Sequence, residues 1–186
     1  MYRNASLKKY LDDLADKLAA PGGGSAAALA GALGVSLISM VINFTIGKPK
    51  YSRYEKKLKG ILEESESLRK ELLRLVDLDV IAYRSKDIRQ AMDVPFVICK
   101  LCFKAIKLCP PLIKIGNINL ISDVAVAAVL LESAFAAAHF NVEINLRCLR
   151  DKKLSLGVKK DLKAKVSSIK KIRVNTEVSV GKIIRG

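Results

Sequence analysis

The stretch at residues 21–46 restricts the possible folds more than any other part of the chain. It opens with a proline, three glycines and a serine, and continues as a nearly unbroken run of apolar residues, most of them small. Alanine favours helix, and a helix that is apolar on every side has to be covered by other elements. We expect Ser25 to be the N-cap of this helix. The stretch therefore predicts a buried helix inside a closely packed helical bundle.

The glycines before this helix permit two interpretations. Glycine leaves backbone amides uncovered and free to adopt positive φ, and amides at a helix N-terminus attract carboxylates, phosphates and polarised carbonyls. Gly22, Gly23, Gly24 and Ser25 are therefore candidate ligand-binding residues. The motif is not a Walker loop, because alanines follow Ser25 where that motif has a lysine and a hydroxyl residue. In the second interpretation, the glycines form a tight turn that lets two helices approach closely.

The apolar run at residues 26–46 is also long enough to cross a bilayer. We nevertheless expect no membrane span, because Ser25, Ser36 and Asn43 fall on one helical face, with Ser39 close by. A polar stripe on an apolar helix favours burial in a bundle, with the stripe turned toward a cleft. The simpler alternative is that these side chains hydrogen-bond to the backbone.

The remainder of the chain predicts further helices and no strand, because apolar residues recur three and four positions apart. The segments with this spacing are residues 6–18, 51–83, 95–108, 122–150 and 158–183. We expect Pro95 to begin the third of them, and Pro110 with Pro111 to end it. The prediction is an all-α fold: a single domain over residues 1–186, built as a bundle of about six helices.

The predicted helix at residues 122–150 has one face of polar and small residues. We expect Ser122 or Asp123 to cap it. Asn141 follows Asp123 by ~18 residues, or about five turns, and Asn145 points within about 40° of both. Packed against the helix at residues 26–46, this face would leave a hydrogen-bonding groove between the two.

Composition limits the core and the partners. Hydrophobic residues make up 51% of the chain and aromatic residues only 5%, so the core has to be built from Ala, Val, Leu and Ile. The formal charge is +15, and residues 147–186 hold 13 Lys or Arg against three acids, so they carry 10 of those charges. Such a region can attract nucleic acid, a membrane surface or a polyanionic small substrate. It can equally be a solvated lysine face.

Few side chains are available for catalysis. His139 is the only histidine, so neither a histidine-rich metal site nor a serine-histidine triad is expected. Proton transfer then falls to lysine or to carboxylates in apolar settings, which are Asp79, between Leu78 and Val80, and Asp123. Burial raises the pKa of a carboxyl group toward the range useful for general catalysis. The structural alternatives are a buried hydrogen bond for Asp79 and a helix cap for Asp123.

The four cysteines do not form the pattern of a zinc site. Cys99, Cys102 and Cys109 would share one helical face, but they lack the paired spacing of structural zinc ligands, and Cys148 is distant in sequence. We expect small buried hydrophobes and no metal. The N-terminus shows no secretion signal, so reduced thiols and a cytoplasmic location are expected.

Several motifs together resemble one known family. They are PGGGSAAALAGALG at residues 21–34, SMVINFTIGK at 39–48, DLDVIAY at 77–83, GNINLISDVAVAA at 116–128 and FNVEINLRCLRD at 140–151. In this order they resemble the cyclodeaminase/cyclohydrolase family of folate enzymes, and the resemblance covers nearly the whole chain.

The resemblance implies an all-helical homodimer that acts on folate, including polyglutamylated folate, without a metal or redox cofactor. The reaction it implies first is cyclisation of formimidoyltetrahydrofolate to methenyltetrahydrofolate with release of ammonia; the alternative is hydrolysis of methenyltetrahydrofolate. Asp79 matches the position that acts as proton acceptor in cyclodeaminases. The glycines and Ser25 would hold the folate. Further residues lining the groove would be Lys48, Asn117, Asn119, Asp123, Asn141 and Asn145.

The sequence departs from the family pattern after Tyr83. Members usually have a longer segment there, whereas this chain continues as YRSKDIRQAMDVPF almost directly into the next helix. A third function therefore stays open, that of a catalytically inactive homologue acting as a binding or scaffold protein. Nucleic acid is not expected as the partner of the enzyme.

Overall fold

The computed structural model describes residues 1–186 as seven α-helices and three short 3-10 helices, with no strand. The α-helices are α1 (Leu7–Ala15), α2 (Gly23–Asn43), α3 (Glu55–Ser85), α4 (Ile88–Ile106), α5 (Cys109–Ile115), α6 (Ile121–Cys148) and α7 (Lys152–Arg185). The 3-10 helices are η1 (Tyr2–Asn4), η2 (Pro49–Tyr54) and η3 (Ile118–Leu120). The predicted all-α fold is confirmed, and the short α5 is the addition to the expected six helices.

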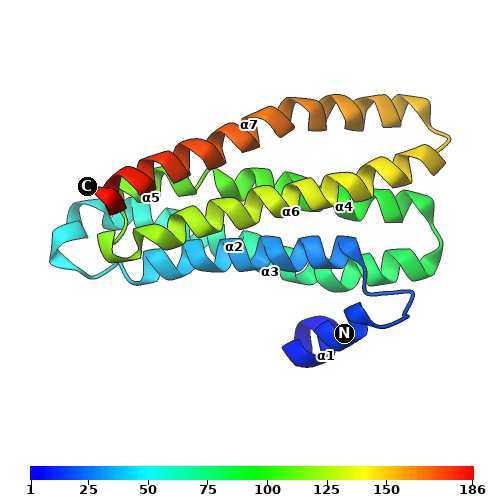
Figure 1. Cartoon of the computed structure of the whole chain (residues 1–186), viewed down its shortest axis with the longest axis horizontal. Coiled ribbons are helices and arrows are strands. Elements are labelled where there is room, and N and C mark those ends of the chain that lie inside the picture. Colours follow the sequence, from blue (N-terminus) through cyan, green and yellow to red (C-terminus); the bar gives the residue numbers. More distant parts are fainter.

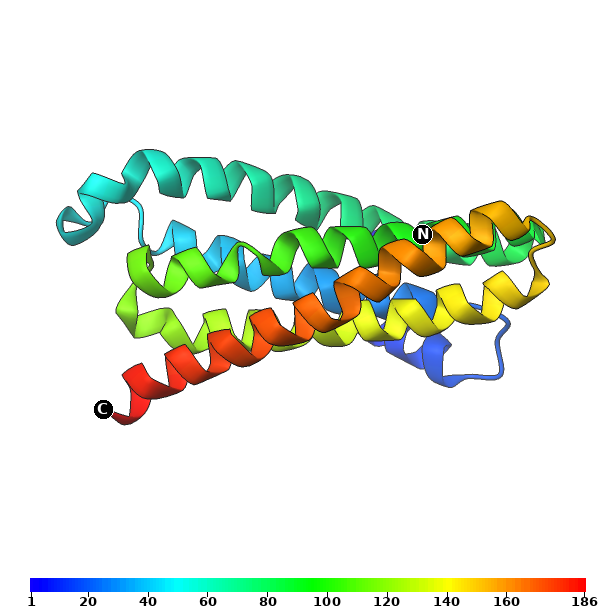
Figure 2. The same cartoon turned by 90° about the horizontal axis from the view of Figure 1, so that it is seen from above.

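Four long helices form the body of the bundle (Figure 1). α2 packs against α3 and α6, and α4 packs against α3 and α6, so the four enclose one core. α7 lies outside this group and crosses α4 and α6 obliquely, as the view from above shows (Figure 2). α1 stands beside the bundle, near the N-terminal part of α2 (Figure 1).

Glycines in α2 set how closely its neighbours approach. A Cβ built on Gly34 would lie 2.9 Å from Leu131 Cγ and 3.2 Å from the carbonyl oxygen of Ala127, both on α6. A Cβ on Gly31 would lie 3.0 Å from the Sγ atom of Cys102 on α4. Since real Cβ atoms rarely come so close to other atoms, the small residues of α2 allow the tight packing that a core poor in aromatic residues requires.

The polar residues inside α2 do not line a cleft. Ser36 Oγ donates to the carbonyl oxygen of Ala32, one turn earlier in the same helix. Ser39 is buried, and its Oγ lies 2.9 Å from that of Ser65 on α3. Ser36 therefore makes only the hydrogen bond to its own helix that the simpler alternative predicted, whereas Ser39 connects α2 to α3.

Both predicted helix starts in apolar sequence were wrong by a few residues. Gly22 occupies the N-cap position of α2, and Ser25 is fully buried in the first turn. Similarly, α6 begins at Ile121, before Ser122, and Leu120 holds its N-cap position. Asp123 then lies in the first turn of α6, where its charge is favourable to the helix dipole.

The prolines do not bound α4 as expected. α4 begins at Ile88, where the side chain of Asp87 caps it by accepting two backbone hydrogen bonds, and Pro95 lies inside the helix. Pro110 and Pro111 do not end α4 but occupy the first turn of α5. A first-turn residue has no intrahelical partner for its amide, so proline is tolerated there.

One side of the bundle is exposed and apolar. α2 and α6 are long and apolar enough to cross a bilayer by length and composition, yet both belong to the bundle, and the most apolar window of α6 is only 39% buried. Figure 1 shows the two helices side by side in front of α3 and α4. The exposed side chains of this surface, called here the apolar face, are Leu33, Phe44, Val126, Val129, Phe140 and Ile144.

Candidate active site

Asp79, on α3, lies against the N-terminus of α2. Its Oδ2 accepts a hydrogen bond of 2.9 Å from the backbone N–H of Ser25. This amide belongs to the first turn, which a helix leaves without internal partners, so Asp79 supplies from α3 the cap that Gly22 lacks. The predicted proton acceptor and the predicted ligand loop therefore meet at one place, called here the glycine end of the bundle.

The glycines at this end have different roles. A Cβ on Gly24 would lie 2.0 Å from Asp79 Oδ1, so the carboxylate occupies the space that a side chain would need. A Cβ on Gly23 would lie 3.5 Å from Asn141 Nδ2, and one on Gly22 would meet nothing within 4 Å. Gly24 thus admits Asp79, as the close-approach interpretation requires, while Gly22 and Gly23 leave the backbone open to a ligand.

Burial decides the protonation behaviour of Asp79. Desolvation raises the pKa of its carboxyl group above the ordinary value, and the hydrogen bond from the Ser25 amide opposes this shift only in part. A carboxylate with a raised pKa is a stronger base, so Asp79 is better suited than an ordinary carboxylate to accept a proton.

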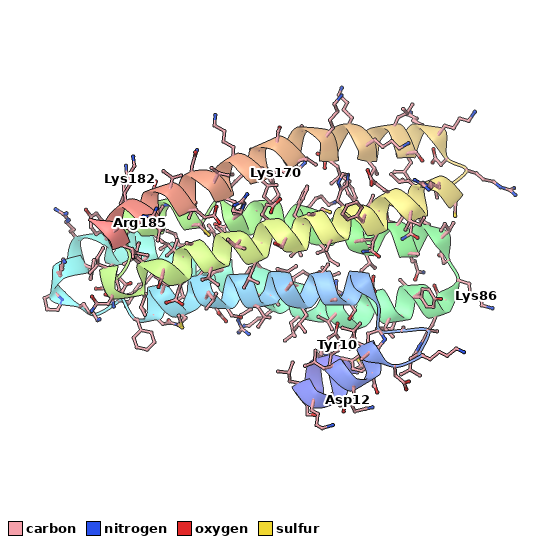
Figure 3. All side chains as sticks on the ribbon, in the orientation of Figure 1. Tyr10, Asp12, Lys86, Lys170, Lys182 and Arg185 are labelled. Atoms are coloured by element: carbon pink, nitrogen blue, oxygen red, sulfur yellow. The ribbon has the colours of Figure 1, made fainter.

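Tyr10, on α1, completes the glycine end. Its hydroxyl donates to Ser25 Oγ at 3.1 Å, and Ser25 Oγ donates to the carbonyl oxygen of Val76 at 2.9 Å. Figure 3 shows Tyr10 on the side of α1 that faces the bundle, and Asp12 on the opposite side. Burial raises the pKa of the Tyr10 phenol. Sequence reasoning missed this residue, although an aromatic ring among the leucines of α1 was an available signal.

Asp77, a second carboxylate of α3, was also missed. It is buried, accepts a hydrogen bond of 2.5 Å from the backbone N–H of Tyr2, and lies 3.6 Å from Nε of Arg3. The ring of Tyr2 packs edge-to-face on that of Tyr10. Asp77 therefore holds η1 on α3, and through Tyr2 it helps to place Tyr10 at the glycine end.

Asn141 and Asn145 lie one turn apart on α6, and their side-chain amides have different partners. Asn141 lies beside Gly23 and donates to the carbonyl oxygen of Ala137 in its own helix. Asn145 donates at 2.6 Å to the carbonyl oxygen of Ala91 on α4. That carbonyl has no intrahelical donor, because the residue four positions later is Pro95. Asn145 therefore has a structural partner, and Asn141 is the better placed of the two to meet a ligand.

The other predicted residues lie at the opposite end of the bundle. The side chain of Asn117 accepts a hydrogen bond from the backbone N–H of Asn119 and donates one to the carbonyl oxygen of Phe44. It therefore connects η3 to the turn after α2. Lys48 and Asn119 are exposed there. Asp123 lies in the adjoining first turn of α6. We call this group the far end.

The two ends are too distant to touch the same small molecule within one chain. α2 runs from Gly23 to Asn43, which corresponds to about 30 Å of helix. Asp123 and Asn141 are likewise about 27 Å apart along α6, although they point the same way. A single groove containing all the predicted residues is therefore not present in one chain.

The remaining polar candidates lie away from the glycine end. No three His, Cys, Asp or Glu side chains are grouped so as to hold a metal ion. Cys99, Cys102 and Cys109 are buried in the core, and burial raises the pKa of Cys99 and of Cys109 to about 12. His139 is paired with Glu143 on the α7 side of α6, its Nε2 3.8 Å from Glu143 Oε1.

Comparison with known proteins assigns the chain to a family. A family model described as Formiminotransferase-cyclodeaminase matches residues 6–87 and 84–164. The two matched parts meet at the short turn between α3 and α4, where the sequence departs from the expected pattern. The matches cover well over half of the chain, and the chain therefore belongs to the formiminotransferase-cyclodeaminase family.

Individual relatives agree with this assignment. The methenyltetrahydrofolate cyclohydrolase of Methylorubrum extorquens is 37% identical over 175 residues, which cover 82% of this chain and 84% of that protein. The rat formimidoyltransferase-cyclodeaminase is 29% identical over 80% of this chain, but the match spans only 32% of the rat protein. The crystal structure of a formiminotetrahydrofolate cyclodeaminase from Thermotoga maritima aligns with a TM-score of 0.93 at 26% identity, covering 99% of this chain and all of that one.

Proposed function

We propose that the protein is a folate one-carbon enzyme that hydrolyses methenyltetrahydrofolate. The observation that carries this proposal is the partly buried carboxylate of Asp79, held at the open glycine end of α2. The cyclohydrolase relative supports hydrolysis, because it is 37% identical over most of both chains. We place hydrolysis ahead of cyclodeamination, the reaction that the sequence resemblance implied first.

Asp79 would act as the general base. It takes a proton from water while the water oxygen forms a bond to the bridging carbon of the substrate. One carbon–nitrogen bond of the bridge then breaks and the released nitrogen takes that proton from Asp79. The hydroxyl proton on the bridging carbon passes to solvent, so a formyl group remains on the other nitrogen. One base with a raised pKa is sufficient for this reaction. No metal or redox cofactor is needed at any step.

The backbone of Gly22 and Gly23 would hold the substrate beside Asp79. Their amides lie at the positive end of the α2 dipole, which favours a carbonyl or an anionic group. Asn141 stands next to Gly23 and would contribute its side-chain amide. The charge of +15 would attract folate, including polyglutamylated folate, from a cytoplasmic pool.

Cyclodeamination is the second candidate, supported by the close structural match to the Thermotoga maritima enzyme. In this reaction, the base takes a proton from the attacking amine, and the departing ammonia has to receive one. Asp79 would have to perform both transfers in turn, because the Tyr10 hydroxyl is engaged with Ser25.

We further propose that the protein is a homodimer joined through the apolar face. Phe140 is 72% exposed and Leu33 is 53% exposed on this surface, and contiguous apolar patches of this kind mark interfaces. A two-fold axis in the interface, at right angles to the helices, would bring the far end of one chain to the glycine end of its partner. Lys48 and Asn119 could then reach the substrate held by the other subunit.

Two variants would test the dimer. Phe140→Glu together with Ile144→Glu should give a monomer by light scattering at micromolar concentration, because four charges would be buried across the two-fold interface. Leu156→Glu is the matched control, since Leu156 is exposed on α7, away from this surface, and should leave the dimer intact. A wild-type monomer would contradict the proposal.

One pair of assays tests the reaction. The absorbance of methenyltetrahydrofolate should fall faster with the purified protein than without it, whereas formimidoyltetrahydrofolate should yield neither this absorbance nor ammonia. Cyclisation of formimidoyltetrahydrofolate without hydrolysis of methenyltetrahydrofolate would make cyclodeamination the supported reaction. Inactivity of the folded protein on both substrates, with salt-dependent retention on heparin, would favour the scaffold function.

A further inference from the structure

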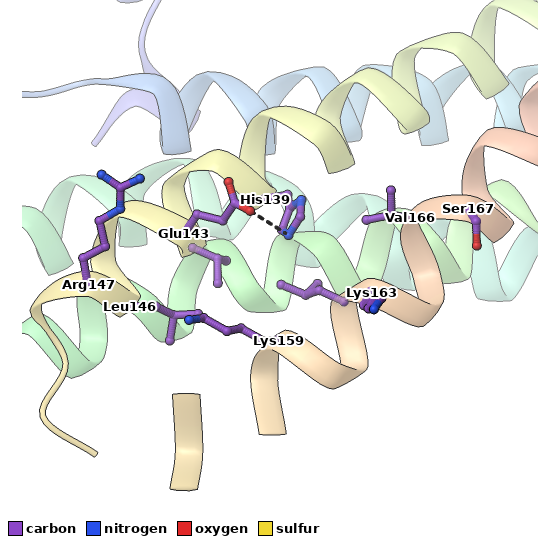
Figure 4. Close-up of a pocket in the computed structure, with 10 residues that line it drawn as sticks. His139, Glu143, Leu146, Arg147, Lys159, Lys163, Val166 and Ser167 are labelled. Atoms are coloured by element: carbon purple, nitrogen blue, oxygen red, sulfur yellow. Dashed lines mark ion pairs between the residues drawn. The ribbon is translucent and has the colours of Figure 1, made fainter. Parts of the chain in front are cut away.

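A groove between α6 and α7 forms a second candidate site. It has a volume of about 660 Å³ and is drawn in Figure 4. The residues that line it are His139, Val142, Glu143, Leu146 and Arg147 from α6, and Lys159, Leu162, Lys163, Val166 and Ser167 from α7. Each set repeats at spacings of three and four, so both helices present one continuous face to the groove.

The groove is separate from the glycine end. Asn141, which lies beside Gly23, is about 200° around α6 from both His139 and Glu143. None of the residues assigned to folate binding lines the groove.

The lining combines an apolar floor with a cationic rim. Val142, Leu146 and Leu162 are buried, and they form the floor together with the partly buried Val166. The rim carries three cations, Arg147, Lys159 and Lys163, against the single carboxylate of Glu143, which lies 3.8 Å from His139 Nε2. An occupant has to match both parts: an apolar body for the floor and a negative charge for the rim.

Size decides between a small molecule and a protein segment. From His139 to Arg147 the groove extends about 12 Å along α6. That is about two turns of helix, less than the three to four turns of an average helix in a globular protein. A volume of 660 Å³ falls within the usual range for small-ligand pockets, about 300–1,000 Å³.

We infer that the groove between α6 and α7 binds a small amphipathic anion, an apolar chain or ring system that ends in a carboxylate or phosphate. The apolar part lies between Leu146, Leu162 and Val166. The anionic head pairs with Lys159 and Lys163, which lie four residues apart on one face of α7.

Decanoate is a suitable probe for this groove. Decanol and decyltrimethylammonium carry the same alkyl chain with a neutral and a cationic head group, so they serve as controls. Isothermal titration calorimetry should detect decanoate binding at one site per chain, weakened by added salt, with decanol at least about tenfold weaker. Equal affinity for decanol would overturn the inference, as would binding of the cation. Anionic phospholipids carry the same chemistry, so binding to phosphatidylglycerol vesicles without binding of monomeric decanoate would also overturn it.

Matched variants locate the site. Lys159→Gln with Lys163→Gln should lower decanoate affinity about tenfold, whereas Lys170→Gln with Lys171→Gln removes the same charge from exposed positions of α7 outside the groove and should change it less than about twofold. Val166→Asn alters the floor and keeps every charge, and it should also weaken binding. Asp79→Asn should leave decanoate affinity unchanged. Equal losses in the two lysine pairs would contradict a specific site.

Cys148 provides an independent readout. It is the one exposed cysteine and follows Arg147 directly, while the other three are buried. An environment-sensitive fluorophore attached to it should change its emission as decanoate binds, with the affinity found by calorimetry. Calorimetric binding that leaves the emission unchanged would place the ligand elsewhere and refute the inference.

Discussion

The glycine end and the far end look alike in sequence, since both combine glycine with Asn, Asp or Ser beside apolar runs, but the structure uses their polar groups differently. At the glycine end, a carboxylate is held in apolar surroundings opposite a helix dipole. At the far end, Asn117 bonds the backbone of neighbouring turns. Of the two ends, the glycine end is therefore the one that offers a candidate for proton transfer.

The largest effect is expected from Asp79→Asn. Asparagine can still accept the hydrogen bond from the Ser25 amide but cannot take a proton, so turnover should fall by about 10²- to 10⁴-fold with little change in folate affinity. Kinetics and thermal melting measured on one preparation would show this. Near wild-type turnover in the folded variant would leave Asp79 as a helix cap only.

The same variant has a pH signature. Because burial raises the pKa of Asp79, the folded state favours the protonated carboxyl group. Wild-type stability should then fall relative to Asp79→Asn as pH rises from the ordinary pKa of about 4 through the raised value. Below about pH 4, the melting temperatures of the two proteins should converge. A gap that widens toward acid pH would mean that the pKa is lowered instead.

Gly24→Ala should have the next largest effect. The new methyl group would enter the space of the Asp79 carboxylate, so we expect turnover to fall by roughly 10²-fold and the free energy of unfolding by about 1–3 kcal/mol. Gly60→Ala is the control, because that glycine is helical with nothing within 4 Å and should gain about 0.5–1 kcal/mol. Equal behaviour of the two variants in kinetics and urea unfolding would show that Gly24 has no special role.

Asn117→Ala would test the far end. Removing the Asn117 side-chain amide leaves the Phe44 carbonyl and the Asn119 N–H without their partner, and this should lower the free energy of unfolding by about 1–3 kcal/mol. Decanoate affinity and the protonation of Asp79 should not change. If turnover falls far more than stability, the far end contributes to catalysis through the partner subunit.

The smallest expected effect concerns Asn145 and Pro95. Asn145→Ala should cost about 1–2 kcal/mol, because the Ala91 carbonyl loses its donor. In a Pro95→Ala background the restored amide can bond to that carbonyl, and the cost should nearly vanish. A double-mutant cycle by urea unfolding measures this coupling of about 1 kcal/mol. Additive effects would mean that the carbonyl has another partner.

The helices were predictable because hydrophobic spacing reports which side of a helix is buried. Asp79 and the glycines could be selected as candidates because an acid in apolar sequence and an open helix start are both unusual. Asp79 as the cap of α2 was not predictable, since its contact with Ser25 joins residues 54 positions apart. Tyr10 and the separation of the two ends were missed for the same reason: both depend on how whole helices pack, which the local pattern does not record.

The capping of α2 by a residue of α3 has a consequence for how the site forms. The Ser25 amide acquires its acceptor only when the two helices dock, so its protection against hydrogen exchange should report that docking directly. In Asp79→Asn a weaker acceptor would speed exchange at Ser25, whereas amides in the middle of α2 would keep their protection. Faster exchange confined to Ser25 would show that the start of α2 opens locally, without unfolding of the bundle.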